Sequence, residues 1–554
     1  MRNHPLMWVA KKVRSRWAGI ALLTLANIGY SLFSVFFALG TRGVIDSAVE
    51  GDLEMFRIAC LKQAAIIAVI LTCLTLMRHM NERLRADLEK DWKRKLLHGL
   101  LYGDYASVKE YHSAELLNRL NNDVTKVNDG ILSILPSTAA MATKVTAAVL
   151  VLGVLDGRFA VYIVALGILV ILATGVMRRH LKELNKRVSE QDGKVSGFLQ
   201  EIMEKLLMVQ AMDVSEEVEH RSDVLLEERY TIQRKRKNIS LMTNTGISLM
   251  SYGAGFLALT WCAYRLLHGQ MSFGSLTAVT QLVSQLQAPF VNLSGILPKY
   301  TAMVASAERL QELDAIQGEP LPLEESPAEL YRQMKSIRAD ALCFSYDRER
   351  VLENADFCLP KGTFSVITGP SGIGKSTLLK LLLGVFHLDR GNLYLECENR
   401  PVSVDRSLRK LFAYVPQGNL LLSGSLRENL TIVRPEASDT EIMQAIYASA
   451  LEDVLPSLPR GLDTVLGESG AGLSEGQAQR LAIARAVLGG APVLLLDECT
   501  SALDEETERT VLRRLKELPG RTCIAVTHRP AAAALCDLRL EVMDGRINTV
   551  YNET

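Results

Sequence analysis

A glycine-rich segment in the second half of the chain has the composition and spacing of a phosphate-binding loop. Residues 369–377 read Gly-Pro-Ser-Gly-Ile-Gly-Lys-Ser-Thr, between an apolar stretch at 364–368 and a leucine-rich helical pattern at 378–383. A triphosphate needs several backbone N–H donors around its oxygens, and glycines let the backbone approach closely. The alternative, a glycine-rich turn that happens to contain a lysine, fits this strand and helix setting poorly.

The residue types in this loop have chemical reasons. We expect Lys375 to place a positive charge near the β- and γ-phosphates and Ser376 to offer its hydroxyl to Mg²⁺. The helix that follows presents its positive N-terminus to the same oxygens. The predicted nucleotide contacts in the loop are Gly369, Ser371, Gly372, Gly374, Lys375, Ser376 and Thr377.

An acidic pair follows a second apolar stretch. Residues 491–498 read Ala-Pro-Val-Leu-Leu-Leu-Asp-Glu, as expected of a buried parallel strand that brings acids to its carboxyl end. We expect Asp497 to hold the Mg²⁺ shell and Glu498 to polarise the attacking water. Another buried strand, 522–527, ends at His528, which can hydrogen-bond the γ-phosphate or the water. The alternatives are a solvated acidic pair and a structural histidine.

A second glycine-rich loop precedes a helical pattern. Residues 467–477 read Gly-Glu-Ser-Gly-Ala-Gly-Leu-Ser-Glu-Gly-Gln and lead into 478–488. Ser474 and Gly476 at the helix start predict a second anion-binding terminus. One phosphate loop does not need another such terminus in its own domain, so a partner's nucleotide could use it.

Tyr346 ends a predicted strand segment, 342–346, ahead of the phosphate loop. An exposed ring there could stack on adenine, whereas a buried strand aromatic is the alternative.

Composition excludes some functions. The 554 residues suffice for two or more domains. The net charge of +0 argues against a nucleic-acid partner, since no basic excess is available to neutralise phosphates. The nine cysteines form no Cys-x-x-Cys pair, so neither a zinc site nor a disulfide framework is indicated.

The first half of the chain contains apolar stretches of membrane-spanning length. The second reaches that length only if Lys62 extends to the headgroups, which makes it the weakest of the set. A basic N-terminus and a nucleotide domain should both be cytoplasmic, so the number of spans must be even. We predict six spans, at 18–41, 59–77, 131–155, 159–177, 239–264 and 273–297.

Two of the connections between spans are long, charged and helical in period. These are 78–130 and 178–237, and they predict two helical arms that extend into the cytoplasm. Lys144 lies near the middle of the third span, where an ionised side chain is costly. It is interpreted either as a residue of a substrate cavity or gate, or as a structural lysine paired with a neighbouring helix.

The predicted fold class is therefore a membrane helical bundle with cytoplasmic extensions, followed by an α/β domain with a phosphate loop. The helical domain is expected at 1–317, a linker rich in proline and acidic residues at 318–335, and the α/β domain at 336–554.

With these residues in view, the chain resembles an ATP-binding cassette (ABC) transporter of the exporter type, built as a half-transporter. The most specific motif is Leu-Ser-Glu-Gly-Gln at 473–477, which stands in family order with the phosphate loop, the acidic strand and His528. The resemblance covers nearly the whole chain. The family signature commonly has Gly where Glu475 stands, and Ala or Pro where Cys499 stands.

The resemblance implies roles for further residues. Gln417, in Tyr-Val-Pro-Gln, resembles the glutamine that senses the γ-phosphate and Mg²⁺. Residues 501–504 resemble the loop that links two nucleotide sites, and 111–127 the first coupling segment. Glu468 falls in the stretch that touches the arms in exporters. The implied contacts with ATP are Tyr346 in the chain's own site, and Ser474, Gly476, Gln477 and Asp504 in a site shared with the other subunit.

The resemblance implies an ATP hydrolase that exports a substrate by alternating access, with ATP and Mg²⁺ as cofactors. An importer that shares the fold, and an ATP-gated channel or regulatory subunit, are the alternatives. The expected partners are a second half-transporter in a homodimer, with a degenerate partner left open, membrane lipid, and a hydrophobic or amphipathic cargo such as a lipid, drug or peptide. We expect a bacterial plasma membrane location with the N-terminus and nucleotide domain in the cytoplasm.

Overall fold

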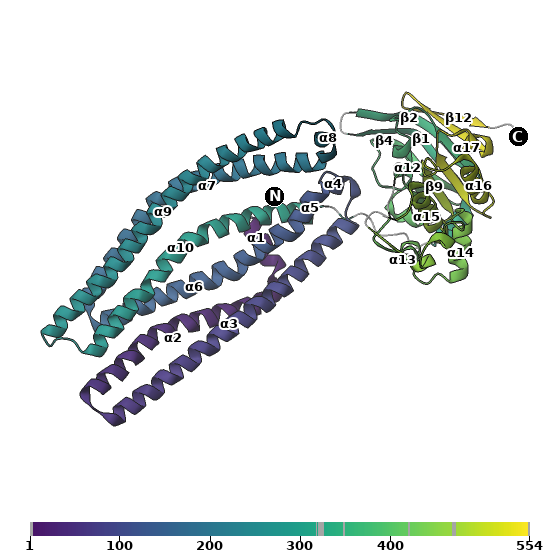
Figure 1. The fold of residues 1–554 in the computed structure, drawn as a ribbon. Coiled ribbons are helices and arrows are strands. Elements are labelled where there is room, and N and C mark those ends of the chain that lie inside the picture. Colours follow the sequence, from purple (N-terminus) through teal and green to yellow (C-terminus); the bar gives the residue numbers. More distant parts are fainter. Residues whose placement is uncertain are drawn as a thin grey trace. The chain divides into compact units, whose positions relative to one another are not determined.

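The computed structural model describes residues 4–316, 318, 326–346, 349–418, 421–467 and 472–551. Within helices, the side chains of 169–182, 247, 287–295 and 297 lie outside the description, as does the side chain of 551. The chain forms two compact units. The first comprises Met1–His98 and His112–Ala315, and the second comprises Gly99–Tyr111 and Ile316–Thr554 (Figure 1).

The first unit is built of helices, several of them very long. Each predicted span lies within one helix, and the weakest, 59–77, lies in α3. The elements are α1 (Pro5–Lys12), η1 (Arg14–Arg16), α2 (Trp17–Glu50), α3 (Leu53–Tyr102, whose last turn enters the second unit), α5 (Ser113–Asn118), η2 (Arg119–Asp123), α6 (Val124–Leu155), α7 (Gly157–Glu204), α8 (Leu206–Ala211), α9 (Ser215–Leu267) and α10 (Phe273–Asp314).

Four of the described helical stretches are long and apolar enough to cross a membrane, namely Arg14–Glu50, Leu53–Tyr102, Ser113–Leu155 and Ser215–Leu267. They contain the first, second, third and fifth predicted spans. The fourth and sixth predicted spans lie in α7 and α10, partly over side chains outside the description. Lys144 is partly buried on α6, and its role stays a prediction.

Small side chains let the helices of the first unit approach closely. Ala38 on α2, Ala148 on α6 and Ala258 on α9 are fully buried in one apolar cluster. In a membrane, burial of apolar surface gives helices little driving force to associate, and small residues favour association because they let the backbones pack closely. Polar caps set the connections, because Asp156 accepts the Phe159 N–H to start α7 and Ser272 accepts the Ser275 N–H to start α10.

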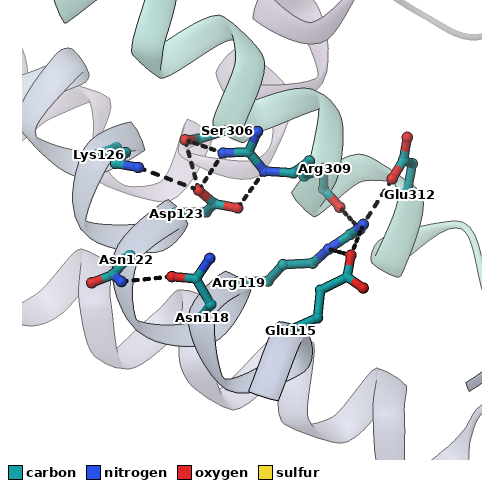
Figure 2. A network of polar contacts seen from close by, with 9 residues as sticks. All are labelled: Glu115, Asn118, Arg119, Asn122, Asp123, Lys126, Ser306, Arg309 and Glu312. Carbon is teal, nitrogen blue, oxygen red and sulfur yellow. Dashed lines mark hydrogen bonds and ion pairs between the residues drawn. The ribbon is translucent and has the colours of Figure 1, made fainter. Parts of the chain in front are cut away.

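A polar network ties the start of α6 to the end of α10 (Figure 2). The carboxylate of Asp123, which is fully buried, accepts hydrogen bonds from Arg309 at 2.6 and 2.7 Å and from the Ser306 hydroxyl at 2.9 Å. Arg119 donates to Glu312 at 3.0 Å and to Glu115 at 2.7 Å. Both Arg119 and Asp123 belong to η2, a π-helical turn, and both meet α10.

The second unit is an α/β domain together with residues 99–111, the segment at the tip of α3. Its helices are α4 (Tyr105–Lys109), α11 (Pro327–Gln333), α12 (Lys375–Leu382), α13 (Leu426–Thr431), α14 (Asp439–Ala448), α15 (Glu475–Leu488), α16 (Glu505–Lys516) and α17 (Pro530–Leu535). Its strands are β1 (Met334–Tyr346), β2 (Glu349–Pro360), β3 (Phe364–Thr368), β4 (Arg390–Cys397), β5 (Val402–Ser403), β6 (Phe412–Val415), β7 (Gly424–Ser425), β8 (Val465–Leu466), β9 (Val493–Asp497), β10 (Thr522–Val526), β11 (Leu538–Met543) and β12 (Arg546–Tyr551).

Two main sheets form this domain. The larger has the order β12-β11-β3-β10-β9-β6, in which β11, β3, β10, β9 and β6 run parallel and β12 is antiparallel at the edge. The smaller is antiparallel, with the order β2-β1-β4-β5. The buried faces of β3, β9 and β10 explain their continuous apolar runs, since a parallel strand is covered on both sides.

In the second half of the interval predicted as a linker, 318–335, the structure has a helix. Residues 319–325 lie outside the description, but α11 follows and is packed into the domain. Leu330 and Tyr331 are buried, and the Tyr331 hydroxyl lies 2.8 Å from that of Thr522. The prolines and acidic residues of the segment outnumber its few apolar residues, so the sequence pattern did not predict this short helix.

The Asp123 network supports a prediction about stability. Burial opposes the charge of Asp123, but the hydrogen bonds from Arg309 and Ser306 outweigh it and hold the pKa of Asp123 below its ordinary value. Because Arg309 is partly exposed and can reach water, we expect Asp123→Ala to cost about 2 kcal/mol, the scale of hydrogen bonds to a charged group. A group with a lowered pKa stabilises the fold above its ordinary pKa, so this contribution is lost as the pH falls below about 4.

The measurement is the melting temperature of the detergent-solubilised chain at neutral and acidic pH. The matched control is Asp223→Ala on the exposed surface of α9, which should leave the melting temperature unchanged. Equal melting temperatures for the two variants at neutral pH would contradict the stabilising role of the network.

Candidate functional site

Four parallel strands bring the predicted site residues to one edge of the large sheet. The glycine-rich loop follows β3, and His528 follows β10. Asp497 ends β9 with Glu498 directly after it, and Gln417 follows β6. These strands are neighbours, in the order β3, β10, β9, β6. The carboxyl edge of a parallel sheet is where ligands bind in open α/β folds.

The loop at 369–377 turns from β3 into α12 through left-handed backbone. Gly374 precedes α12 with φ 106°, and a Cβ there would lie 2.3 Å from a methyl carbon of Val351, so only glycine fits. Lys375 is 5% exposed, and its ammonium donates to the carbonyls of Gly369 at 2.9 Å and Pro370 at 2.7 Å. Burial lowers the pKa of Lys375, although Glu498 and Asp497 act in the opposite direction.

Ser376 and Asp497 form a pair of oxygen donors. The Ser376 hydroxyl donates to Oδ1 of Asp497 at 2.8 Å, and the Tyr414 hydroxyl donates to Oδ2 at 3.0 Å. Asp497 is 1% exposed, so both of its oxygens are held in the domain interior. Burial and the Asp497 carboxylate raise the pKa of Tyr414 well above its ordinary value, which keeps the phenol a hydrogen-bond donor.

The carboxylate of Glu498 is held from two sides. Gln417 donates its amide to Oε2 at 2.7 Å, and Nε2 of His528 lies 3.0 Å from Oε1. The backbone of Glu498 is left-handed, with φ 47°, a conformation that is unfavourable for a residue with a Cβ. Gln417, Glu498 and His528, which are far apart in the sequence, therefore meet at the sheet edge.

Tyr346 belongs to an aromatic cluster. Its ring centroid lies 4.9 Å from that of Phe344 and 5.4 Å from that of Phe386, and its hydroxyl lies 3.3 Å from that of Thr377. The ammonium of Lys109, on α4, lies 5.3 Å from the ring centroid. Tyr346 is thus half-buried on its strand and connected to α12 through Thr377.

The second glycine-rich segment forms a separate group. Ser474 is the N-cap of α15 and exchanges hydrogen bonds with Gln477, at 2.9 and 3.3 Å. A Cβ on Gly476 would lie 3.0 Å from the carbonyl oxygen of Ala502. Asp504 caps α16 by accepting the Thr507 N–H at 2.9 Å. Glu468 lies outside the described residues.

Of the two departures from the family pattern, Glu475 is exposed at the first turn of α15. Cys499 is fully buried, and burial raises the pKa of its thiol to about 12. The thiol is therefore neutral at physiological pH. Cys499 directly follows Glu498 in the chain.

Several residues at the site were not identified from the sequence. Tyr414 stands three positions before Gln417 on β6, and the strand pattern there was the available signal. Residues 99–111 join the second unit, immediately ahead of the segment 111–127 that resembles the family's coupling segment. In this unit Tyr105 packs against Phe386 at 6.1 Å and Asp104 lies 3.5 Å from His387. Only the fold brings these residues together.

Two family models match the chain. The model of the ABC transporter transmembrane region matches residues 17–290, and the ABC transporter model matches residues 352–501.

Curated relatives agree with these models. The chain is 30% identical over 427 residues to the cyclolysin secretion/processing ATP-binding protein CyaB of Bordetella pertussis, covering 76% of this chain and 58% of that protein. It is 33% identical over 314 residues to the mitochondrial iron-sulfur clusters transporter ATM1 of Yarrowia lipolytica, covering 55% of this chain and 44% of that protein. A probable ABC transporter ATP-binding/permease protein of Haemophilus influenzae is 26% identical and is matched over 95% of both chains.

A solved structure shares the fold. The structure of a bacterial Atm1-family ABC exporter with ATP bound aligns with a TM-score of 0.79 and 23% identity, over 97% of this chain and 95% of that chain. The chain therefore belongs to the ABC transporter family, with a transmembrane helical domain followed by an ABC nucleotide-binding domain.

Proposed function

We propose that the chain is an ATP-driven exporter that works as a dimer of identical chains. The observation that carries the proposal is the meeting of Gln417, Glu498 and His528 beside the phosphate-binding loop, in a chain whose other unit is a bundle of membrane-length helices. This arrangement suits attack of water on the γ-phosphate of ATP. The fused helical bundle suits a chain that uses the free energy of this hydrolysis to move a substrate across a membrane.

The oxygen donors at the site fit Mg²⁺. Ser376 and Asp497 offer a hydroxyl and a carboxylate within 2.8 Å of each other, and the side-chain oxygen of Gln417 lies on the neighbouring strand end. Mg²⁺ prefers such hard oxygen ligands, with nucleotide phosphates and water completing its shell. When bound, it would neutralise phosphate charge during transfer.

Glu498 is proposed as the group that orients and deprotonates the attacking water. Each of its two oxygens has one partner, Gln417 or His528. A carboxylate has about four lone-pair sites, so Glu498 can still accept a hydrogen bond from a water. His528 and Gln417 would then contact the γ-phosphate and the metal shell. Lys375 would exchange its bonds to the Gly369 and Pro370 carbonyls for phosphate oxygens.

The segment at the tip of α3 is proposed to couple the nucleotide domain to the helices. Asp104, Tyr105 and Lys109 contact His387, Phe386 and Tyr346 inside the second unit. Arg406 also donates to the carbonyl of Tyr102 at 2.9 Å. A change in the aromatic cluster of Tyr346, Phe344 and Phe386 would therefore be passed to residues 99–111, which continue from α3.

The proposed dimer completes two composite sites. Ser474, Gly476 and Gln477 would contact ATP held by the second chain, with Asp504 in the loop between the two sites. The exposed N-terminus of α15 supports this, since it offers backbone donors to an anion. The chain carries both halves of such a site, which favours a homodimer.

The proposed cargo is hydrophobic or amphipathic, and the proposed location is a bacterial plasma membrane with both the N-terminus and the nucleotide domain in the cytoplasm. A surface cavity of the first unit supports the amphipathic class, because Phe37 lines it together with the uncharged polar residues Thr280, Gln281, Ser284 and Gln285. The relatives' names give different cargoes, cyclolysin and iron-sulfur clusters, so they do not narrow the class.

The role of Glu498 predicts a separation of binding from hydrolysis. We expect Glu498→Gln to lower the ATPase kcat by about 10²-fold or more, because the amide cannot accept the proton of the water, while ATP binding is retained. The measurement is the ATPase rate of the purified chain in lipid, beside equilibrium ATP binding and the mass of the particle. Glu517→Gln, at the exposed end of α16, is the control. Substantial residual hydrolysis would remove Glu498 from this role.

The proposed stacking of adenine on Tyr346 predicts a dependence on the ring. We expect Tyr346→Ala to raise the KM for ATP about tenfold, the scale of one base stacked on an aromatic side chain, whereas Tyr346→Phe keeps it within about twofold. The ATPase rate as a function of ATP concentration measures both. If Tyr346→Phe weakens ATP use as much as Tyr346→Ala, the hydroxyl contact with Thr377 is what matters and the stacking proposal is wrong.

A further inference from the structure

Arg529, which directly follows His528, holds the loop between the two proposed nucleotide sites. We infer that Arg529 is a positioning residue: together with Glu508 and Gln479 it fixes the loop 501–504, in which all but Leu503 are exposed, so that the state of His528 in one site sets the loop offered to the other. This inference rests on the proposed dimeric ATPase.

The guanidinium of Arg529 makes contacts that fit its fork geometry. One nitrogen donates to the carbonyl of Ser501 at 2.5 Å, and the other donates to the carbonyl of Leu503 at 2.6 Å. The second nitrogen also reaches the Glu508 carboxylate at 3.3 Å. Two carbonyls of one short loop are therefore held by one side chain, whose own backbone N–H donates to the Thr527 hydroxyl at 3.1 Å.

Glu508 provides a buried anchor beneath the loop. It is 0% exposed, and its other oxygen accepts the Thr500 hydroxyl at 2.8 Å. A buried carboxylate is costly unless it is paired and hydrogen-bonded, so Glu508 fixes the positions of Thr500 and Arg529 on either side of it.

Gln479 holds the same loop from α15. Its amide donates to the Ser501 hydroxyl at 3.2 Å, and its oxygen accepts the Ala502 N–H at 3.1 Å. A Cβ on Gly476 would lie 3.0 Å from the Ala502 carbonyl oxygen, so the start of the same helix runs close to the loop. The loop is thus held between the helix that carries the Leu-Ser-Glu-Gly-Gln motif and the strand end that carries His528.

Because Arg529 is the residue after His528, the position of His528 at the site is connected to the position of loop 501–504. His528 contacts Glu498, and the next residue holds the carbonyls of the loop that runs to Asp504. The loop also begins at the site, since the Ser501 N–H donates to the Glu498 carbonyl at 3.2 Å. A backbone displacement at His528, made as its ring approaches a γ-phosphate, would therefore be passed to Arg529 and through its two hydrogen bonds to the loop. A lysine, with one ammonium, cannot hold both carbonyls and the carboxylate in this planar arrangement.

The test uses the full chain in lipid with ATP as the ligand. We expect Arg529→Lys to lower kcat about tenfold and to reduce the Hill coefficient for ATP toward one, while ATP affinity changes by less than about twofold. Glu508→Gln keeps an acceptor for Thr500 but removes the charge that faces Arg529, so it should act in the same direction. Arg509→Lys, in an exposed ion pair with Glu505 on the same helix, is the matched control and should change none of these values.

The outcomes separate the inference from the proposed function. An active wild-type chain whose kcat and Hill coefficient are unaffected by both Arg529→Lys and Glu508→Gln would overturn the inference alone. So would losses of rate that follow a parallel fall in ATP affinity and melting temperature, because they indicate only a structural role. A wild-type chain that hydrolyses no ATP would overturn the proposed function and this inference with it.

Discussion

The parallel register of β3, β10, β9 and β6 is the constraint on which the rest of the second unit depends. Because their carboxyl ends meet at one edge, a lysine, an acidic pair, a histidine and a glutamine from four distant segments share a site. The polar contacts then follow from charge. Glu498 has a partner at each of the two neighbouring strand ends, and Asp497 accepts hydrogen bonds from α12 and from β6.

The same edge is also where the backbone departs from regular geometry. Glu498 is left-handed at the point where β9 ends, and its N–H still pairs with the carbonyl of Val526 on β10 at 3.0 Å. Strained residues persist where the surrounding structure fixes them, and the neighbouring strand does so here. The chain after Glu498 then turns at once into the loop held by Arg529. The position of Glu498, the proposed catalytic group, and the path of the loop are consequently set by the same strand end.

The sequence predicted those parts of the fold in which local chemistry is self-sufficient. The glycine-rich loop, the apolar strands around it and the helical spans each carry their pattern in consecutive residues, and β3, β9, β10 and α15 lie where those patterns indicated. Contacts that depend on two distant segments could not be predicted in this way. Neither Lys109 nor Tyr414 has a neighbour in the sequence that reveals its partner, and α11 was concealed within a polar, proline-rich interval.

The polar network of the first unit sets how its helices are aligned, whereas the polar contacts of the second unit gather at the edge of a sheet. The chain passes between the units after residues 98, 111 and 315, and the Asp123 network lies on the first-unit side of the last two crossings, at 115–123 and 306–312. Apolar packing alone is non-directional, and helices that share small apolar faces can slide past one another. Buried charges paired by hydrogen bonds tolerate no such slide, because a displaced partner leaves a carboxylate without compensation. The network thus fixes the register of α6 against α10, close in the chain to the two points at which it crosses to the other unit.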